Sequence, residues 1–80
     1  MKAKIHVSLK NGVLDPQGKA IETALHGLGF DGAQNVRQGK LIELDLDTSD
    51  EAAARRLADE MCQKLLANPV MESYTIELVA

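Results

Sequence analysis

The sequence predicts a single α+β domain over residues 1–80, with its elements in the order β-α-β-β-α-β. Three observations support this prediction. Residues 2–10 and 40–47 alternate apolar and polar side chains, which is typical of strands with one buried face. Two further segments carry apolar residues at helical spacing. Each helical segment begins at a capping residue and ends at glycine or proline, so the predicted elements are sharply bounded.

The first strand is expected at residues 2–10, KAKIHVSLK. The side chains predicted to face the core are Ala3, Ile5, Val7 and Leu9. His6 belongs to the polar face of this strand. We expect a solvated histidine there, because no carboxylate or second ligand is adjacent in the sequence.

The loop after this strand combines a turn, an apolar pair and a helix start within LKNGVLDPQGKAI, residues 9–21. An Asn-Gly pair predicts the turn, and an Asp-Pro pair predicts the helix start with Asp15 as its N-cap. Val13 and Leu14 are apolar residues in a loop and need an explanation. They either plug an edge of the core or are presented to another protein.

The first helix is expected to bury one apolar stripe. That stripe consists of Ala20, Ile21, Ala24, Leu25 and Leu28. Gly29 suits the left-handed position that ends a helix, and Phe30 is expected to pack back after it. His26 faces away from the stripe, near the negative end of the helix dipole.

Residues 33–38 predict a brief second strand, which Gln38 and Gly39 would close as a hairpin turn. The third strand, residues 40–47, alternates cleanly as KLIELDLD. Its three outward carboxylates lack the loop geometry of a calcium site. We therefore expect them to pair with lysines across the sheet.

The second helix is predicted to start at Thr48, with Glu51 completing a capping box. Its buried stripe is Ala54, Leu57, Ala58, Met61 and Leu65, flanked by Cys62 and Leu66. Asn68 and Pro69 end the helix. The last strand is expected at residues 70–79.

Right-handed crossovers place both helices on one face of an antiparallel sheet, giving a ferredoxin-like two-layer sandwich. The usual strand order for this topology, 4-1-3-2, puts the first strand between the third and the last. The lysines of the first strand would then lie between Glu43 and Asp45 on one side and Glu77 on the other.

The composition argues against nucleic-acid and membrane binding. The net charge is −3, and Phe30 and Tyr74 are the only aromatic residues on which bases could stack. No apolar run approaches the roughly 20 residues of a membrane span, and no signal peptide is apparent. A single cysteine suits a reducing compartment, so we expect a cytoplasmic protein. A core of this size is marginal, which favours oligomerisation or docking on a larger partner.

The loop after the first strand lacks the residues that catalytic or metal-binding domains of this topology carry there. It contains no Cys-x-x-Cys pair and no arginine, and GVLDPQGK lacks the spacing of a phosphate-binding loop. Cys62 is expected in mid-helix, away from a helix N-terminus that would lower its pKa, so we expect it to pack rather than react. No catalytic, cofactor-binding or metal-binding residue is predicted.

Four segments carry a resemblance that covers essentially the whole chain. They are LKNGVLDPQGKAI at 9–21, LGF at 28–30, VRQGK at 36–40 and LLANPVMESYTIE at 65–77. In this order and spacing they resemble PurS, the family of small subunits of phosphoribosylformylglycinamidine (FGAM) synthase. Neither GVLDPQGKA nor LLANPV follows from the fold alone, so the resemblance is fairly specific.

The resemblance implies a non-catalytic homodimer in the complex that makes FGAM from formylglycinamide ribonucleotide, glutamine and ATP in purine biosynthesis. The subunit would bridge a synthetase (PurL) and a glutaminase (PurQ) and support ammonia transfer, with ATP and Mg on the synthetase. On this interpretation we expect eight residues to contact the partners. They are Lys10, Val13, Leu14, Arg37, Lys40, Asn68, Pro69 and Val70.

Two alternatives remain at this point. A small-ligand regulatory domain of the ACT type shares the topology and would bind an amino acid at a dimer interface. The four matched segments argue against it. The other alternative is a small enzyme that uses His6 or His26.

Overall fold

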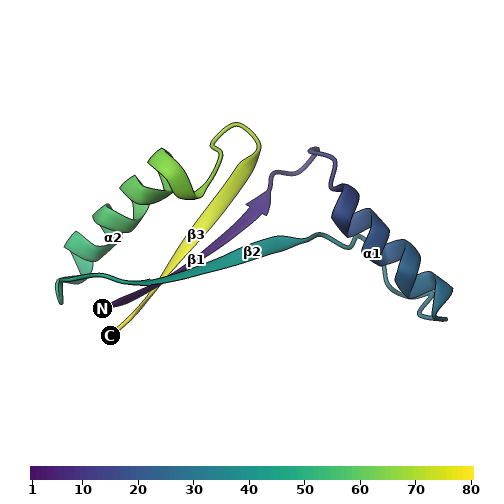
Figure 1. Cartoon of the computed structure of the whole chain (residues 1–80), viewed down its shortest axis with the longest axis horizontal. Helices are drawn as coiled ribbons and strands as arrows, with labels where there is room; N and C mark the ends of the chain where they lie inside the picture. Colours follow the sequence, from purple (N-terminus) through teal and green to yellow (C-terminus); the bar gives the residue numbers. More distant parts are fainter.

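The computed structural model describes all 80 residues. In chain order its elements are β1 (Lys2–Leu9), α1 (Pro16–Gly27), β2 (Gly39–Asp45), α2 (Glu51–Met61), the π-helical turn η1 (Cys62–Leu66) and β3 (Glu72–Val79). The three strands form one antiparallel sheet in the order β2-β1-β3. Figure 1 shows α2 lying against one face of this sheet, while α1 projects from its end. Neither helix is long and apolar enough to cross a membrane.

The core lies between the sheet and α2, and it is small. Ala3 of β1 packs with Ala54 and Ala58 of α2, and Ile5 packs with Cys62 of η1. Small side chains on α2 let the helix approach β1 closely, so this part of the sheet is tightly covered. Only 10 of the 80 residues are buried, which leaves much of the apolar surface without a partner inside the chain.

The predicted fold class, α+β with an antiparallel sheet, is confirmed, and so is the central position of the first strand. The strand order β2-β1-β3 places the lysines of β1 beside acidic residues of both neighbouring strands. Lys4 lies opposite Glu43 on one side and Glu77 on the other, with Lys4 Nζ 3.9 Å from Glu43 Oε1. The outward acids of β2 therefore face lysines, as expected from cross-strand pairing.

The brief strand predicted at residues 33–38 is wrong, because carboxylates of the first helical segment bond to its backbone. Val36 N donates to Glu22 Oε1 at 3.1 Å, and Gln38 N donates to Asp15 Oδ2 at 2.8 Å. Asn35 has φ 55°, which interrupts an extended chain. The backbone N–H groups that a hairpin would use are thus bonded elsewhere.

The prediction that both helices cover one face holds for α2 only. Every residue of α1 except Gly18 is at least partly exposed, and Ile21 and Leu28 of the expected buried stripe are 40% and 74% exposed. Phe30, expected to pack back, is 60% exposed. Two local predictions are confirmed. Asp15 caps α1 by accepting from Gly18 N at 2.8 Å, and Gly29 takes the left-handed conformation with φ 97°.

The boundaries of α2 and β3 differ from the prediction by a few residues. Asp50, rather than Thr48, is the N-cap of α2, and no capping box forms. Thr48 Oγ1 instead accepts from Asp50 N at 3.1 Å, in the turn before the helix. The helical segment ends at Leu66 with Ala67 as its C-cap, so Asn68 does not take the left-handed conformation expected to end it. β3 begins at Glu72, two residues after the expected start at Val70.

Candidate docking surface at the end of the sheet

Three segments far apart in the sequence meet where β1 ends: the loop 10–15, the segment 36–40 before β2, and the corner 67–71 before β3. We call the surface they form the sheet-end surface. Lys10 ties the loop to the corner, with its backbone N donating to Met71 O at 2.9 Å and its Nζ to Pro69 O at 2.7 Å. Figure 1 shows the loop and the corner side by side.

Arg37 fixes the loop from the other side. Its guanidinium donates to Val13 O at 3.0 Å and to Lys10 O at 3.1 Å, and it lies 3.5 Å from Leu9 O. A guanidinium presents its donors in a rigid fork, so bonds to several carbonyls hold the loop in one shape. The backbone of the apolar pair is therefore held in place by an arginine 23 or more residues further along the chain.

Asp15 joins the loop, α1 and the segment before β2. It is buried, with 7% of its surface exposed, and it accepts from Gly18 N and Gln38 N at 2.8 Å each. These two backbone donors, followed by the nearby Arg37 guanidinium, hold the pKa of the carboxyl below its ordinary value. A Cβ on Gly18 would collide with the Val36 carbonyl, so this junction requires glycine.

The corner before β3 is shaped by its own side chains. Asn68 Oδ1 accepts from Val70 N at 3.0 Å, and Glu72 Oε1 accepts from Asn68 N at 2.7 Å. The other carboxylate oxygen of Glu72 lies 4.0 Å from Lys40 Nζ of β2. The corner is thus a bonded turn with a defined shape.

The sheet-end surface presents apolar side chains on this bonded base. Leu14 and Val70 are each 79% exposed, and Met71 is 46% exposed. Val13 is half-buried, so it contributes to both the loop's own packing and the surface. The alternative that Leu14 plugs the core is wrong, because its side chain faces solvent.

All eight residues predicted to contact partners lie in the three segments of this surface. The structure adds what spacing alone did not reveal. Lys10 and Arg37 are bonded to backbone carbonyls of the same chain, so both help to build the surface. Asp15 and Met71 were not predicted as part of it. The Asp-Pro helix start was the visible signal for Asp15, but its bond to Gln38 depends on tertiary structure.

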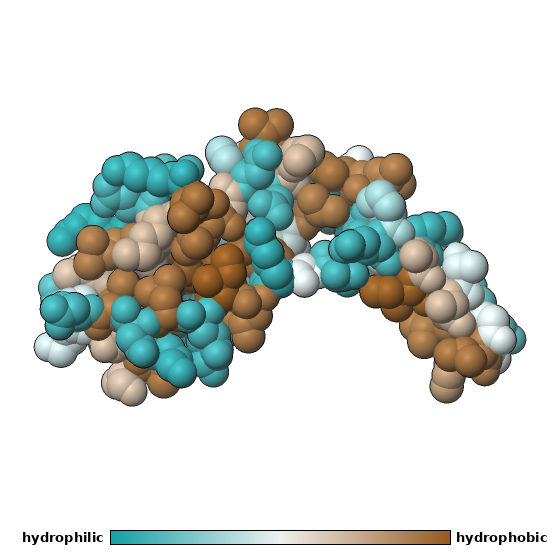
Figure 2. All heavy atoms as spheres, viewed as in Figure 1, coloured by the Kyte–Doolittle hydropathy of each residue, from teal (hydrophilic) through white to brown (hydrophobic).

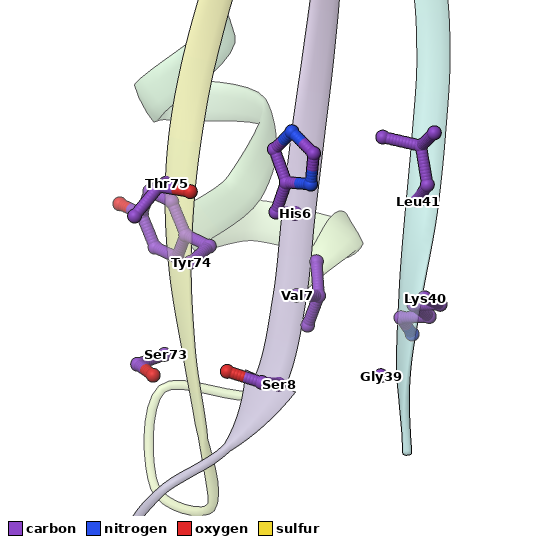
Figure 3. Close-up of a pocket in the computed structure, with 9 residues that line it drawn as sticks. All are labelled: His6, Val7, Ser8, Gly39, Lys40, Leu41, Ser73, Tyr74 and Thr75. Carbon is purple, nitrogen blue, oxygen red and sulfur yellow. The ribbon is translucent and has the colours of Figure 1, made fainter. Parts of the chain in front are cut away.

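The open face of the sheet carries a shallow cavity of about 390 Å³ near the same end. In Figure 3 its lining side chains include His6 of β1, Leu41 of β2 and Thr75 of β3, which the register places side by side. His6 is exposed, as predicted, although its Nε2 lies 3.6 Å from Glu77 Oε1. The sequence could not reveal this carboxylate, because it comes from the last strand.

Cys62 lies in the core and is completely buried. Burial, and to a smaller extent the charge of Asp59, raises the pKa of its thiol, so the reactive thiolate is disfavoured. This agrees with the prediction of a packing cysteine. No three His, Cys, Asp or Glu side chains are grouped so that they could hold a metal ion.

Comparisons with known proteins agree along the whole chain. The family model of PurS, described as phosphoribosylformylglycinamidine (FGAM) synthase, matches residues 2–80. The chain is 49% identical over 77 residues to the phosphoribosylformylglycinamidine synthase subunit PurS of Bacillus subtilis, covering 96% of this chain and 90% of that protein.

Solved structures are similarly close. PurS of Methanocaldococcus jannaschii, a subunit of formylglycinamide ribonucleotide amidotransferase, superimposes with a TM-score of 0.86 at 41% identity, covering 95% of this chain and 92% of that one. A chain in the structure of PurLQS from Thermotoga maritima gives a TM-score of 0.87 at 32% identity, covering 95% and 93%. Sequence and structure together show that the chain belongs to the PurS family of phosphoribosylformylglycinamidine synthase subunits.

Proposed function

We propose that this chain is the small, non-catalytic subunit that holds the synthetase PurL and the glutaminase PurQ of FGAM synthase together. The observation that carries the proposal is the likeness of 95% of this chain, with a TM-score of 0.87, to a chain of PurLQS from Thermotoga maritima. The complex would convert formylglycinamide ribonucleotide, glutamine and ATP into FGAM. The match over residues 2–80 favours this role over that of an ACT-type regulatory domain.

The proposed mechanism is positioning of two active sites. Ammonia released into water at neutral pH is mostly protonated, and an ammonium ion has no lone pair with which to attack. Docking the glutaminase beside the synthetase raises the effective concentration of free ammonia at the second site. ATP and Mg²⁺ are expected on the synthetase. We expect the complex to work in the cytoplasm, where formylglycinamide ribonucleotide, glutamine and ATP are available.

The sheet-end surface suits such docking. Leu14 and Val70 provide apolar area that nothing in the chain covers, while Lys10 and Arg37 hold the backbone beneath them. A surface that is already ordered loses little conformational entropy on binding. Lys10, Arg37 and Lys40 are expected to add polar contacts through the donors that their internal bonds leave free.

We also propose that the chain is a homodimer. Its core buries 10 of 80 residues, and eleven large apolar side chains are exposed. A domain of this size gains little stability from its own core, so association with a second copy would supply buried area that the monomer lacks.

The test is capture of purified PurL and PurQ on the tagged chain. We expect the wild-type chain to retain both proteins, and the double variant Val13→Ser/Leu14→Ser to lose them while still unfolding cooperatively. Leu41→Ser is the matched control, since it removes an exposed leucine from the open face of the sheet. Failure of the wild-type chain to retain either protein would overturn the proposal.

A further inference from the structure

The outer edge of β3 has no strand beside it. The sheet order is β2-β1-β3, so β3 pairs along one side only, from Glu72 to Val79. In an antiparallel ladder, alternate residues turn their N–H and C=O groups away from the partner strand. The Ile76 carbonyl is one of these, because it accepts from Arg55 Nη1, outside the sheet, at 3.4 Å. By the same alternation, Tyr74 and Leu78 also present their backbone groups outward.

This edge has few of the features that keep sheet edges from pairing with other chains. β3 contains no proline and no lysine, its pairing with β1 runs without a bulge, and it is as long as β1. An edge of this kind is a template for an added strand, whose backbone completes the ladder. The unpaired backbone groups therefore favour an extended segment as the occupant.

A cavity beside this edge carries two arginines of α2. It has a volume of about 620 Å³, and its lining residues are Ala52, Arg55, Arg56, Asp59, Tyr74 and Ile76. The four residues from the helix recur at helical spacing, so they share one side of α2. Figure 2 shows hydrophilic atoms along the outer side of α2 and apolar atoms between the helix and the strands. The cavity thus joins a charged side of the helix to the unpaired strand edge.

Both arginines are exposed, and neither has a carboxylate partner. None of the ion pairs of the chain includes Arg55 or Arg56. Asp59, the one carboxylate that lines the cavity, is already bonded. It accepts from the Tyr74 hydroxyl at 2.5 Å and from Gln63 Nε2 at 3.0 Å. The cavity therefore presents two guanidinium groups that are available to an acidic occupant.

The side chains of an added strand would alternate between the two faces of the sheet. Those on the face that α2 covers would lie near Arg55 and Arg56, where carboxylates form charge-assisted hydrogen bonds. Those on the open face would lie beside Thr75 and Glu77, which belong to the face shown in Figure 3, and a carboxylate there would meet a like charge. Acidic residues are therefore favoured at every second position of the segment.

We propose that the outer edge of β3 binds an extended acidic segment of another protein as an added strand, with the acidic side chains on Arg55 and Arg56. The backbone groups of Tyr74, Ile76 and Leu78 supply the ladder bonds, and the arginines select acidic residues. The long bond from Arg55 to the Ile76 carbonyl is exchanged for one from the added strand. This edge contains none of the residues expected to contact PurL and PurQ, so the inference goes beyond the proposed function.

The first test is amide exchange of the purified chain with a synthetic peptide. The peptide has the eight-residue length of β3 and alternates glutamate with valine. At saturation we expect the amides of Tyr74, Ile76 and Leu78 to exchange about tenfold more slowly or less. The amides of Ser73 and Thr75, which face β1, should change little. A peptide with lysine in place of glutamate should have no effect. Unchanged exchange with the acidic peptide would overturn the proposal. Slow exchange of the three amides in the free chain would overturn it too, because the edge would already be covered.

The second test separates selection by the arginines from general attraction of charge. Arg55→Gln/Arg56→Gln should weaken binding of the labelled acidic peptide by about tenfold or more, because the charge-assisted bonds are lost. Lys2→Gln/Lys4→Gln is the matched control, since it removes the same charge from the open face and should bind as the wild type does. Equal losses in both variants, or no loss in the arginine variant, contradict the proposal. A peptide that perturbs the guanidinium signals and leaves the three amides unprotected would mark an anion site only, and strand addition would be wrong.

Discussion

Replacing Leu14 with serine should weaken assembly without weakening the fold. Burying a leucine side chain completely is worth about 1.5–3 kcal/mol. Because Leu14 is 79% exposed in the chain, most of this remains to be gained on docking, about 1–2 kcal/mol. A loss of that size raises the dissociation constant for the partners by about 5- to 30-fold.

The free energy of unfolding should change little, by less than about 0.5 kcal/mol, since substitutions at exposed sites rarely do more. Calorimetric titration against PurL and PurQ measures the first quantity, and urea unfolding measures the second. Leu41→Ser, which removes another exposed leucine, should leave the affinity unchanged. An unchanged affinity of Leu14→Ser would remove this loop from the interface. A stability loss well above 1 kcal/mol would instead place Leu14 in a core.

Three further predictions concern the fold. Ile5→Ala should cost about 2–5 kcal/mol in urea unfolding, because Ile5 is completely buried in a core with few other large side chains. Backbone N–H donors hold the pKa values of the Asp15 and Glu22 carboxyls below their ordinary values. The free energy that these ionised carboxylates contribute to folding is therefore complete above the unfolded-state pKa values of about 4. It is lost as the pH falls through the lower folded-state pKa values. Amide exchange in the segment 36–38 should therefore accelerate in acid, and Asp15→Asn/Glu22→Gln should flatten this pH dependence. The thiol of Cys62 should react with Ellman's reagent only on unfolding, and rapid reaction of the native chain would show that the core opens.

The strands and α2 were predictable because their signals are local. The alternation in β1 and the apolar spacing of α2 each point to one buried face, and the structure buries Ala3, Ile5 and Val7 of β1 and Ala54 and Ala58 of α2. The predicted faces are not buried throughout: the inward residues of β2 are only half-buried, and Leu57, Met61 and Leu65 of the expected stripe are exposed. The position of α1 was not predictable in the same way. Its apolar spacing is that of a buried helix, but the spacing does not say whether the rest of the chain covers that stripe, and here it does not.

The missing strand has a similar explanation. Val36 in its short polar segment fitted a brief strand, but its backbone N–H bonds to Glu22, a residue 14 positions earlier. Competition between a carboxylate and a sheet ladder for the same donor is a tertiary effect, so no local pattern reveals it.

The candidate site was predictable as a set of segments but not as a set of roles. Turn and capping residues identified the loop and the corner, and the structure places them together. Arg37 and Lys10 were expected to face partners, whereas their donors first bind carbonyls of this chain. Sequence shows which residues carry charge, and only the folded chain shows which bonds those charges already make.

The measurement that tests the central claim most directly is FGAM formation by PurL and PurQ, with and without this chain. Glutamine and ammonium chloride are supplied in separate assays. We predict that the chain is required for the glutamine-dependent rate and leaves the ammonia-dependent rate unchanged, because it positions two active sites and supplies no reacting group. An ammonia-dependent rate that also requires the chain, or a glutamine-dependent rate that does not, would contradict this account.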